Sequence, residues 1–468
     1  MKLNPKQWTL FLIIALIFAV VEFKGLTQAG PGDENVYFYM AKAASQGQMP
    51  YKDFFYAHPP LHIFILSILI RIFGINFFIL KSAGLLFILI ASFFLYNLSL
   101  ELFQNKFNDK YANSISIIAV ILFLFSFTTL FTATFSVGVE MSVALMMISF
   151  YLIFTKKYLV GGIFAGLAGL TRLYALVPLF ALFAFIFIKK LQEKKLKDFL
   201  SMFLGFFIIF GTSMILLTAI YGHNFIDPVI KYHFLKPALP GQKSSVYENA
   251  IKENWILFAI SLLFLFAQNK KRMQLFLFVV ILYLLFLIIL SFNVEFYFIL
   301  LFPFLALVGA YSLVNLISRI KIKYVKYFIA LLITLIFLWN TTADTTFLEK
   351  IGFLNFSSLE PMVSKISATN SNQQIFGDAS IAPLVALKSN RNLALNYIDT
   401  NEKTFTSGLT NFYIFSGNLN SANLSYIILK KDYGLYQIEQ FRQYAESRCK
   451  LNETYSDLLE GEFLMYKC

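Results

Sequence analysis

The sequence predicts a polytopic α-helical membrane protein that ends in a small soluble α/β domain. Of its 468 residues, 58% are apolar and only 14% are charged, and the mean hydropathy is +0.68. A soluble domain of this length does not have such a composition. Long apolar runs recur up to residue 341, and Asn, Ser and Thr become frequent after it. We therefore expect a membrane domain at residues 1–341 and a soluble domain at residues 342–468.

The apolar runs are numerous enough for about 11 membrane spans. The first run, Trp8 to Val21, has no small-residue cleavage site after it, so we expect a retained helix rather than a signal peptide. A crossing helix needs about 20 residues, and several runs are shorter than this. The candidate spans are residues 8–26, 78–101, 113–131, 137–155, 158–171, 173–188, 199–221, 254–268, 273–291, 296–317 and 324–341.

The distribution of basic residues predicts which side each loop faces. The formal net charge is +13, but much of it lies in short linkers between apolar runs, where it sets topology, so we assign no nucleic-acid partner. These linkers are expected on the cytoplasmic side if Leu61 to Gly74 is an interfacial or re-entrant helix. The loops at 27–60 and 222–253 and the soluble domain then face outward. The basic linkers are Gln104 to Lys110, Lys156-Lys157, Lys189 to Lys197, Lys270 to Arg272 and Arg319 to Lys326.

The soluble domain is expected to be a small α/β fold. Short β-type runs surround Ile375 and Tyr426, and helical patterns cover Ala382 to Lys388 and Tyr436 to Ser447. The chain has two cysteines, Cys449 and Cys468. An oxidising exterior would pair them and join the last strand to the preceding helix. The alternative is two unpaired thiols.

The first external loop carries the residues most suited to catalysis. It contains Gly30-Pro31-Gly32-Asp33-Glu34-Asn35-Val36-Tyr37, and then Pro50 to Leu61 with Asp53, Tyr56 and His58. A carboxylate can take the proton of an acceptor hydroxyl as a general base. Aromatic faces suit sugars, and cationic groups at the lipid boundary suit a phosphate whose chain stays in the bilayer. Together these residue types indicate glycosyl transfer from a lipid phosphate.

These residues resemble the C-type glycosyltransferases (GT-C), and among them glycosyltransferase family 39, the protein O-mannosyltransferases and lipid A aminoarabinose transferases. Asp33-Glu34 resembles the acidic pair of the first external loop, with Asp33 as the catalytic base. The His58-Pro59-Pro60 run is similar to the segment that faces the carrier phosphate. Glu140 is similar to an acidic residue at the outer start of a later helix. Gly166 to Arg172 resembles a glycine-rich helix that ends in Thr-Lys, with Arg172 in place of lysine.

The resemblance implies an inverting displacement at the anomeric carbon of a sugar linked to polyprenyl or dolichyl phosphate. Asp33, with Glu34 beside it, would accept the proton of the acceptor hydroxyl. His58 and Arg172, with Lys231 or His233 from the loop at 222–253, would stabilise the phosphate that leaves. Tyr37, Asp53, Tyr56 and Glu140 are the further residues expected to contact substrate. No cofactor is required, although a divalent cation shared by Asp33 and Glu140, as in the oligosaccharyltransferase branch, is an alternative.

Each of these residues also has a purely structural interpretation. Asp33 and Glu34 would stabilise a helix start near Asn35, and Asp53 would close a turn after Pro50. His58 would be a packed loop histidine. Glu140 would be a solvated helix start, and Arg172 a helix end that reaches lipid headgroups. The Gly161-Gly162 and Gly166-Gly169 pairs are expected to permit close helix packing rather than to bind a ligand.

A transporter or flippase of a lipid-linked sugar is the alternative function. Transporters usually show internal repeats and ionisable groups near the bilayer midplane, whereas the candidate charges here gather at one surface. We therefore favour an enzyme of the cell membrane whose active site and soluble domain are extracytoplasmic. The acceptor class stays open among a protein hydroxyl, an envelope lipid and a glycan.

Overall fold

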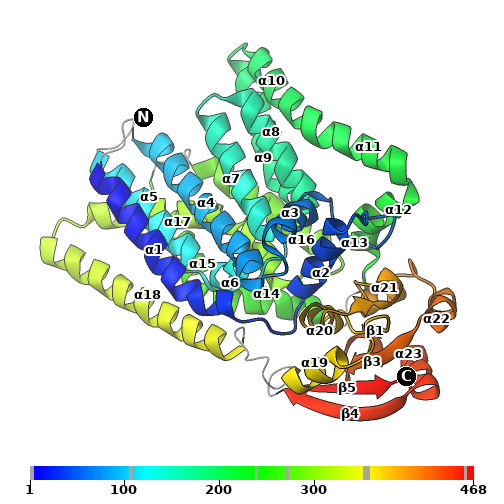
Figure 1. Cartoon of the computed structure of the whole chain (residues 1–468). Coiled ribbons are helices and arrows are strands. Elements are labelled where there is room, and N and C mark those ends of the chain that lie inside the picture. Colours follow the sequence, from blue (N-terminus) through cyan, green and yellow to red (C-terminus); the bar gives the residue numbers. More distant parts are fainter. Residues whose placement is uncertain (1–4, 105–108, 238–240, 269–272, 352–358, 458–460) are drawn as a thin grey trace. The chain divides into compact units, whose positions relative to one another are not determined.

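The computed structural model describes residues 5–104, 109–237, 241–268, 273–351, 359–457 and 461–468 (Figure 1). Within these residues the chain forms two compact units. Unit 1 comprises Met1–Phe23, Lys81–Leu216 and Leu239–Leu348, and unit 2 comprises Lys24–Leu80, Leu217–Ala238 and Glu349–Cys468. Part of the basic linker Gln104 to Lys110 (residues 105–108) and the whole linker Lys270 to Arg272 lie outside the described residues. The predicted domain boundary at residue 341 stays a prediction.

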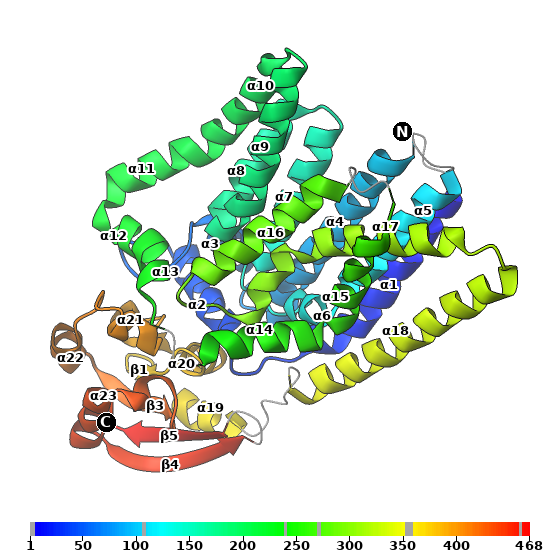
Figure 2. The same cartoon turned by 180° about the vertical axis from the view of Figure 1, so that it is seen from behind.

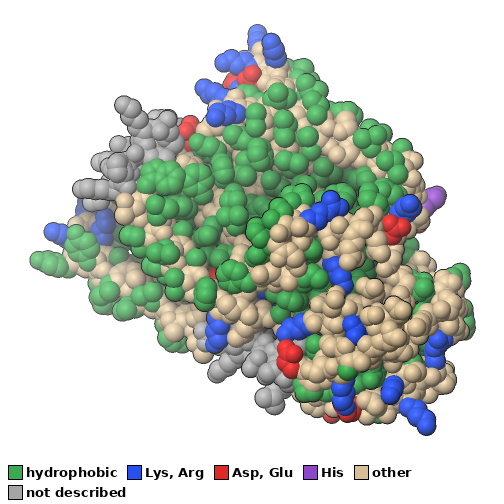
Figure 3. Space-filling model, in the orientation of Figure 1, with side chains coloured by type: hydrophobic (Ala, Val, Ile, Leu, Met, Phe, Trp, Pro, Cys, Tyr) green, Lys and Arg blue, Asp and Glu red, His purple; other side chains and the backbone are tan. Residues whose placement is uncertain are grey.

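Unit 1 is a bundle of apolar helices. Large apolar side chains remain exposed along them, such as Leu16 and Val20 on the first helix, and hydrophobic side chains cover the helical surface in Figure 3. A lipid-facing surface has this character. The helices are α1 (Pro5–Thr27), α4 (Phe77–Phe103), α5 (Asp109–Leu124), α6 (Phe127–Ala133), α7 (Val139–Phe154), α8 (Tyr158–Thr171), α9 (Leu176–Gln192), α10 (Leu196–Phe206), α11 (Thr212–Tyr221), α14 (Gln242–Glu253), α15 (Trp255–Leu262), α16 (Gln274–Ile289), α17 (Phe302–Arg319) and α18 (Lys323–Ile351).

Six described helices are long and apolar enough to cross a membrane, or eight spans if each of two bent helix pairs counts as one. The bent pairs are α5 with α6, at 65°, and α14 with the helix from Trp255 to Phe266, at 77°. At the first bend, the Ser126 hydroxyl donates to the Phe123 carbonyl and so satisfies backbone at the break. These features confirm a polytopic helical membrane fold. The span count of about 11 stays a prediction.

The helices of unit 1 pack closely through glycines. Helix α8 lies against α7 and α10, and α16 lies against α9 (Figure 2). A Cβ added at Gly162 would lie 2.0 Å from the Met202 carbonyl oxygen, and one added at Gly205 would lie 2.1 Å from the Leu159 oxygen. Only glycine permits these backbones to approach so closely. The predicted packing role of the glycines in α8 is confirmed.

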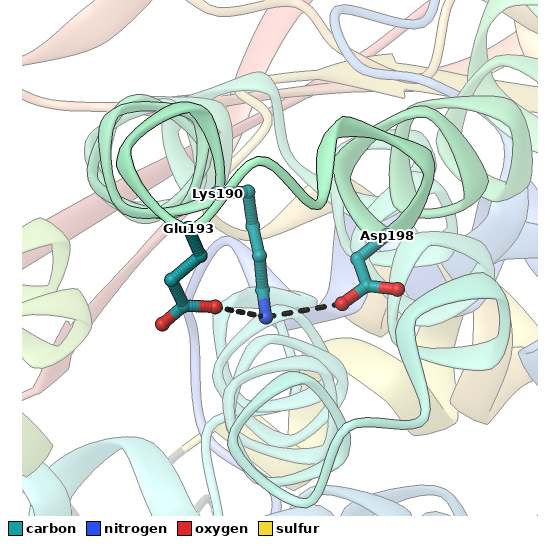
Figure 4. Close-up of polar contacts among 3 residues, drawn as sticks. All are labelled: Lys190, Glu193 and Asp198. Atoms are coloured by element: carbon teal, nitrogen blue, oxygen red, sulfur yellow. Dashed lines mark hydrogen bonds and ion pairs between the residues drawn. The ribbon is translucent and has the colours of Figure 1, made fainter.

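The basic linker between α9 and α10 is closed by ion pairs. Lys190 lies 2.8 Å from the Glu193 carboxylate and 3.0 Å from the Asp198 carboxylate (Figure 4). Lys190 is therefore fixed between the end of one helix and the start of the next.

Unit 2 contains the loop at 27–60, part of the loop at 222–253 and the C-terminal domain. Helix α2 (Glu34–Ser45) lies in the loop at 27–60, and helix α3 (Leu61–Phe73) follows it where an interfacial or re-entrant helix was predicted. Helices α12 (His223–Ile226) and α13 (Tyr232–Leu235) belong to the loop at 222–253. Arg71 of α3 donates to the Ser45 and Ala44 carbonyls at the end of α2. These bonds satisfy carbonyls that a helix end otherwise leaves without partners.

The C-terminal domain is built on a five-stranded sheet with strand order β2-β1-β3-β5-β4. The pairs β1–β2 and β1–β3 are parallel, and β3–β5 and β4–β5 are antiparallel. Phe376, Phe415 and Phe441 lie in its core. The strands are β1 (Gln374–Gly377), β2 (Asn392–Leu393), β3 (Leu424–Lys430), β4 (Lys450–Asp457) and β5 (Gly461–Lys467), and the helices are α19 (Glu360–Ser367), α20 (Ala382–Ser389), α21 (Glu402–Thr406), α22 (Phe412–Asn420) and α23 (Glu439–Arg448).

The predicted features of this domain are present. Strands β1 and β3 cover Ile375 and Tyr426, and α20 and α23 coincide with the two helical patterns. A disulfide joins Cys449, directly after α23, to Cys468, directly after β5. The disulfide therefore connects the last strand with the preceding helix.

We expect Gly162→Ala to destabilise unit 1. The added methyl group would overlap the Met202 carbonyl, and forced overpacking typically costs about 1–3 kcal/mol. Melting temperatures of the detergent-solubilised protein would measure the loss. Gly417→Ala is the matched control because a Cβ at this position of α22 meets open space. Equal melting temperatures for Gly162→Ala and the wild type would contradict the packing argument.

Candidate active site

Asp33 stands at the entrance to helix α2. The helix begins at Glu34, and Asp33 occupies the position before it, yet its side chain makes no capping hydrogen bond. The Asp33 side chain is exposed, whereas Glu34 is buried. The Asn35 side-chain amide donates to the Gly30 and Gly32 carbonyls, at 2.9 and 3.0 Å, and so fixes the turn before Asp33. Asp33 thus stands at the helix start that the structural alternative requires, but it makes no capping hydrogen bond there.

Hydrogen bonds connect the segment around Asp33-Glu34, the acidic loop, to the C-terminal domain. The Gly32 amide donates to the Ser380 carbonyl at 2.9 Å, and the Leu393 amide donates to the Tyr39 hydroxyl at 2.8 Å. Burial raises the pKa of Tyr39 to about 12, although the hydrogen bond from Leu393 opposes the shift. Tyr39 therefore stays neutral and binds as a phenol. Residues flanking Asp33 on both sides are held by the domain at the other end of the chain.

A group of histidine and tyrosine rings follows the acidic loop. His58 stacks on His233, with ring centroids 5.1 Å apart. Tyr37 and Tyr56 contact His58 at centroid distances of 6.1 and 5.9 Å. The structure thus brings together four of the predicted site residues, three from the loop at 27–60 and one, His233, from the loop at 222–253. Because an adjacent anion favours the protonated form of imidazole, this group suits a phosphate.

Backbone hydrogen bonds fix the two stacked histidines. A ring nitrogen of His233, Nε2, lies 2.7 Å from the Ala57 carbonyl oxygen. The Tyr51 hydroxyl donates to the His58 carbonyl at 2.5 Å. Tyr51 was not predicted as a site residue, and its left-handed backbone (φ 69°) shows how tightly this turn is formed. The His233 ring and the His58 backbone are therefore held in place, and the His58 ring stacks on His233.

Two other predicted residues of unit 2 have structural partners. The Asp53 carboxylate accepts a hydrogen bond from the Met49 amide at 2.7 Å, so it closes the turn after Pro50. Lys231 pairs with Asp227 at 2.7 Å, and its side chain is 51% exposed. This ion pair makes Lys231 a weaker candidate for binding phosphate than the buried His233.

Glu140 and Arg172 lie together in unit 1. Both side chains are buried, with 0% and 1% exposure. The Glu140 carboxylate accepts from the Gly138 amide at 2.9 Å and from the Ser136 hydroxyl at 3.3 Å, and it interacts electrostatically with Arg172. Neither a solvated helix start nor a lipid-facing arginine fits such burial. A buried charge needs compensation, which each residue gives the other.

Asp399 is a site residue that the sequence did not reveal. It follows strand β2 in the C-terminal domain and interacts electrostatically with Lys236 and with Asp33. The Lys236 ammonium lies 4.2 Å from the ring centroid of Tyr232. Burial raises the pKa of Asp399 to about 6; Lys236 opposes the shift and Asp33 adds to it. No sequence motif marks this position.

Unit 2 contains two cavities beside these residues. One has a volume of about 300 Å³ and is lined by polar groups that include Lys52, Asn224 and Asp227. The other has a volume of about 100 Å³ and includes Asp399 in its wall. Asp53, Phe54 and Phe55 line both cavities. Within the described residues, no three His, Cys, Asp or Glu side chains are placed to hold a metal ion, and the divalent-cation alternative stays untested.

The raised pKa of Asp399 predicts a pH dependence of stability. A carboxyl group whose pKa is raised by folding favours the folded state when protonated, and that contribution is lost as the pH rises from about 4 through about 6. We expect Asp399→Asn to reduce the pH dependence of the melting temperature between about pH 4 and about pH 6. Asp432→Asn, at an exposed carboxylate of the same domain, is the control and should keep the wild-type slope. An unchanged slope in Asp399→Asn would contradict the assignment.

The comparisons with known proteins concern both the sequence and the fold. A family model described as dolichyl-phosphate-mannose-protein mannosyltransferase matches residues 57–217. This segment includes His58, Glu140 and Arg172, and Asp33 precedes it. No curated protein sequence matches the chain significantly.

Solved structures resemble nearly the whole chain. ArnT from Cupriavidus metallidurans in the apo state has a TM-score of 0.70 and 11% identity, with 97% of each chain covered. The same protein bound to undecaprenyl phosphate has a TM-score of 0.65 and 10% identity, with 99% of this chain and 98% of that chain covered. The archaeal oligosaccharyltransferase AglB from Archaeoglobus fulgidus, in complex with an inhibitory peptide and a dolichol-phosphate, has a TM-score of 0.57 and 11% identity, with 99% and 74% covered. The chain thus has the fold of the C-type glycosyltransferases, the superfamily that its sequence motifs resemble.

Proposed function

We propose that the protein is a membrane glycosyltransferase that transfers a sugar from a polyprenyl or dolichyl phosphate to an acceptor hydroxyl on the extracytoplasmic side. The observation that carries this proposal is the exposed Asp33 carboxylate on a loop that hydrogen bonds hold in place. The matched mannosyltransferase family supports a lipid-phosphate donor, as do the similar structures bound to undecaprenyl phosphate and dolichol-phosphate.

The proposed reaction is a single displacement. Asp33 accepts the proton of the acceptor hydroxyl, and the acceptor oxygen forms a bond to the anomeric carbon. The bond between that carbon and the phosphate oxygen breaks, and its electron pair stays on the lipid phosphate. A single displacement inverts the configuration at the anomeric carbon.

The leaving phosphate needs positive charge or hydrogen-bond donors. In unit 2, His58 and His233 are the candidates because their rings are stacked and the His233 ring contacts the Ala57 carbonyl. In unit 1, Arg172 is the candidate, since its guanidinium fork suits phosphate oxygens. Glu140 orients Arg172 through the attraction between their opposite charges.

We expect Asp33→Asn to lose at least 100-fold in transfer, because general-base catalysis typically contributes about 10²–10⁴-fold. The assay uses proteoliposomes and a panel of radiolabelled polyprenyl and dolichyl phosphate sugars, and it follows both the glycosylated product and the released lipid phosphate. Asp432→Asn is the matched control. If the labelled lipid instead crosses the bilayer unchanged, and equally in both variants, the protein is a transporter.

Substitutions of Arg172 should separate its charge from its geometry. We expect Arg172→Lys to keep measurable binding of undecaprenyl phosphate, because the positive charge remains. Arg172→Gln should weaken binding by tenfold or more, because it removes the positive charge that would face the phosphate and that opposes the buried Glu140 carboxylate. Fluorescence titration with undecaprenyl phosphate measures binding, and melting temperatures separate it from misfolding. Equal affinity of the glutamine variant and the wild type would exclude Arg172 from the donor site.

A further inference from the structure

The smaller cavity of unit 2 lies between the first external loop and the C-terminal domain. Its volume is about 100 Å³, enough for several water molecules or for a small polar fragment of a ligand. Phe54 and Phe55 of the loop line one part of it. Asp399, Thr404 and Thr410 of the C-terminal domain line another. The wall thus combines aromatic rings with hydroxyl and carboxylate groups, the combination that suits a carbohydrate or another polyol.

One hydroxyl in this wall lacks a protein partner. Thr404 belongs to the short helix α21, and its side chain is only 3% exposed. Within the part of the chain that the structure describes, its hydroxyl oxygen has no hydrogen-bond partner. Buried hydroxyl groups are nearly always hydrogen-bonded. Thr404 therefore has hydrogen-bonding capacity that a molecule in the cavity can use.

The neighbouring wall residues are fixed by the domain. The Thr400 hydroxyl donates to the Gly377 carbonyl at 2.6 Å, so Thr400 anchors the segment rather than offering a free donor. Leu395 and Asn396, which also line the cavity, both have left-handed backbone with φ of 53° and 57°. Such backbone costs energy in residues other than glycine and recurs at ligand sites. The segment from Leu395 to Thr404 is thus held in one conformation.

Asp399 relates the cavity to the proposed catalytic base. Its carboxyl group lines the cavity and also interacts electrostatically with Asp33 and Lys236. Charge interactions of this kind act over short distances. Asp399 therefore couples the cavity electrostatically to the group that would accept the proton of the acceptor.

We propose that this cavity binds a polyol part of the acceptor, with Thr404 and Asp399 as its hydrogen-bond partners and Phe54 and Phe55 as its apolar walls. The inference rests on the proposed function, because it places the acceptor of that reaction. It assigns the C-terminal domain a direct part in acceptor selection, and it favours a sugar or glycerol moiety over an alcohol without further hydroxyl groups.

Glycerol is a suitable probe because it is a small triol. Proteoliposomes receive a panel of radiolabelled polyprenyl and dolichyl phosphate sugars, including mannose, with rising glycerol concentrations. Transfer to water yields free sugar, and transfer to glycerol yields the glycoside. We expect Thr404→Val to lower the ratio of glycoside to free sugar by about tenfold, the effect of one lost hydrogen bond of about 1.4 kcal/mol. Total donor consumption should change less than twofold.

Three further variants complete the experiment. Thr404→Ser keeps the hydroxyl and should restore the wild-type ratio. Thr406→Val is the matched control, because Thr406 lies on the same helix but is exposed. Asp399→Asn should lower the ratio in the same direction as Thr404→Val. Melting temperatures identify any variant that fails to fold.

The outcomes separate this inference from the function on which it rests. A wild-type protein that consumes no donor would contradict both. Donor consumption without transfer to glycerol, or equal ratios in Thr404→Val and Thr406→Val, would overturn the acceptor cavity and leave the glycosyltransferase intact. A lower ratio in Thr404→Val, restored in Thr404→Ser, would support it.

Discussion

The end of strand β1 and the loop that follows it, residues 377–380, are the element on which the candidate site of unit 2 depends. Its Gly377 carbonyl accepts the Thr400 hydroxyl, and its Ser380 carbonyl accepts the Gly32 amide. One short loop therefore positions both the acidic turn and the wall of the cavity. Asp378 holds this loop, since its carboxylate accepts from the Lys430 and Leu435 amides, each at 2.6 Å. Burial raises the pKa of Asp378 to about 7, and these two bonds oppose the shift.

Glycines permit this arrangement. A Cβ at Gly377 would lie 2.1 Å from the Ile428 carbonyl oxygen, and one at Gly434 would lie 2.3 Å from the Asp378 carboxylate. The sheet also contributes, because the Cys468 amide donates to the Ser425 carbonyl and the disulfide fixes Cys468 to the end of α23. The sheet thus fixes β1 through its neighbours β3 and β5. The loop after β1 in turn holds the turn that carries Asp33. The C-terminal domain is a structural part of the site.

Local patterns in the sequence predicted the membrane helices, the glycine packing, strands β1 and β3 and the pairing of the cysteines. Each depends on residues close together in the chain, or on composition. The roles of Asn35 and Tyr51 were missed because they depend on backbone geometry within the loop at 27–60. Asp399 and Thr404 were missed because their neighbours are far away in sequence. No residue near Asp399 in the chain indicates its interaction with Asp33 or Lys236. The bends at Ser126 and Asn254 likewise depend on tertiary contacts, since Asn254 bonds to Thr128.

Lipid-facing residues and residues that contact distant segments differ in how strongly their identity is constrained. This difference explains how the fold is kept at 10–11% identity to the similar structures. A lipid-facing helix requires only apolar character, so most of unit 1 tolerates exchange. Residues that meet across the chain are constrained by their partners instead. In unit 2 the Tyr39 hydroxyl accepts a hydrogen bond from the Leu393 amide, so a change of Tyr39 removes a contact between distant segments. The bond from the Gly32 amide to the Ser380 carbonyl joins two backbone groups and constrains the side chain at position 380 less. Divergence should therefore be slowest at side chains that join segments distant in sequence, as at the boundary between the loop at 27–60 and the C-terminal domain.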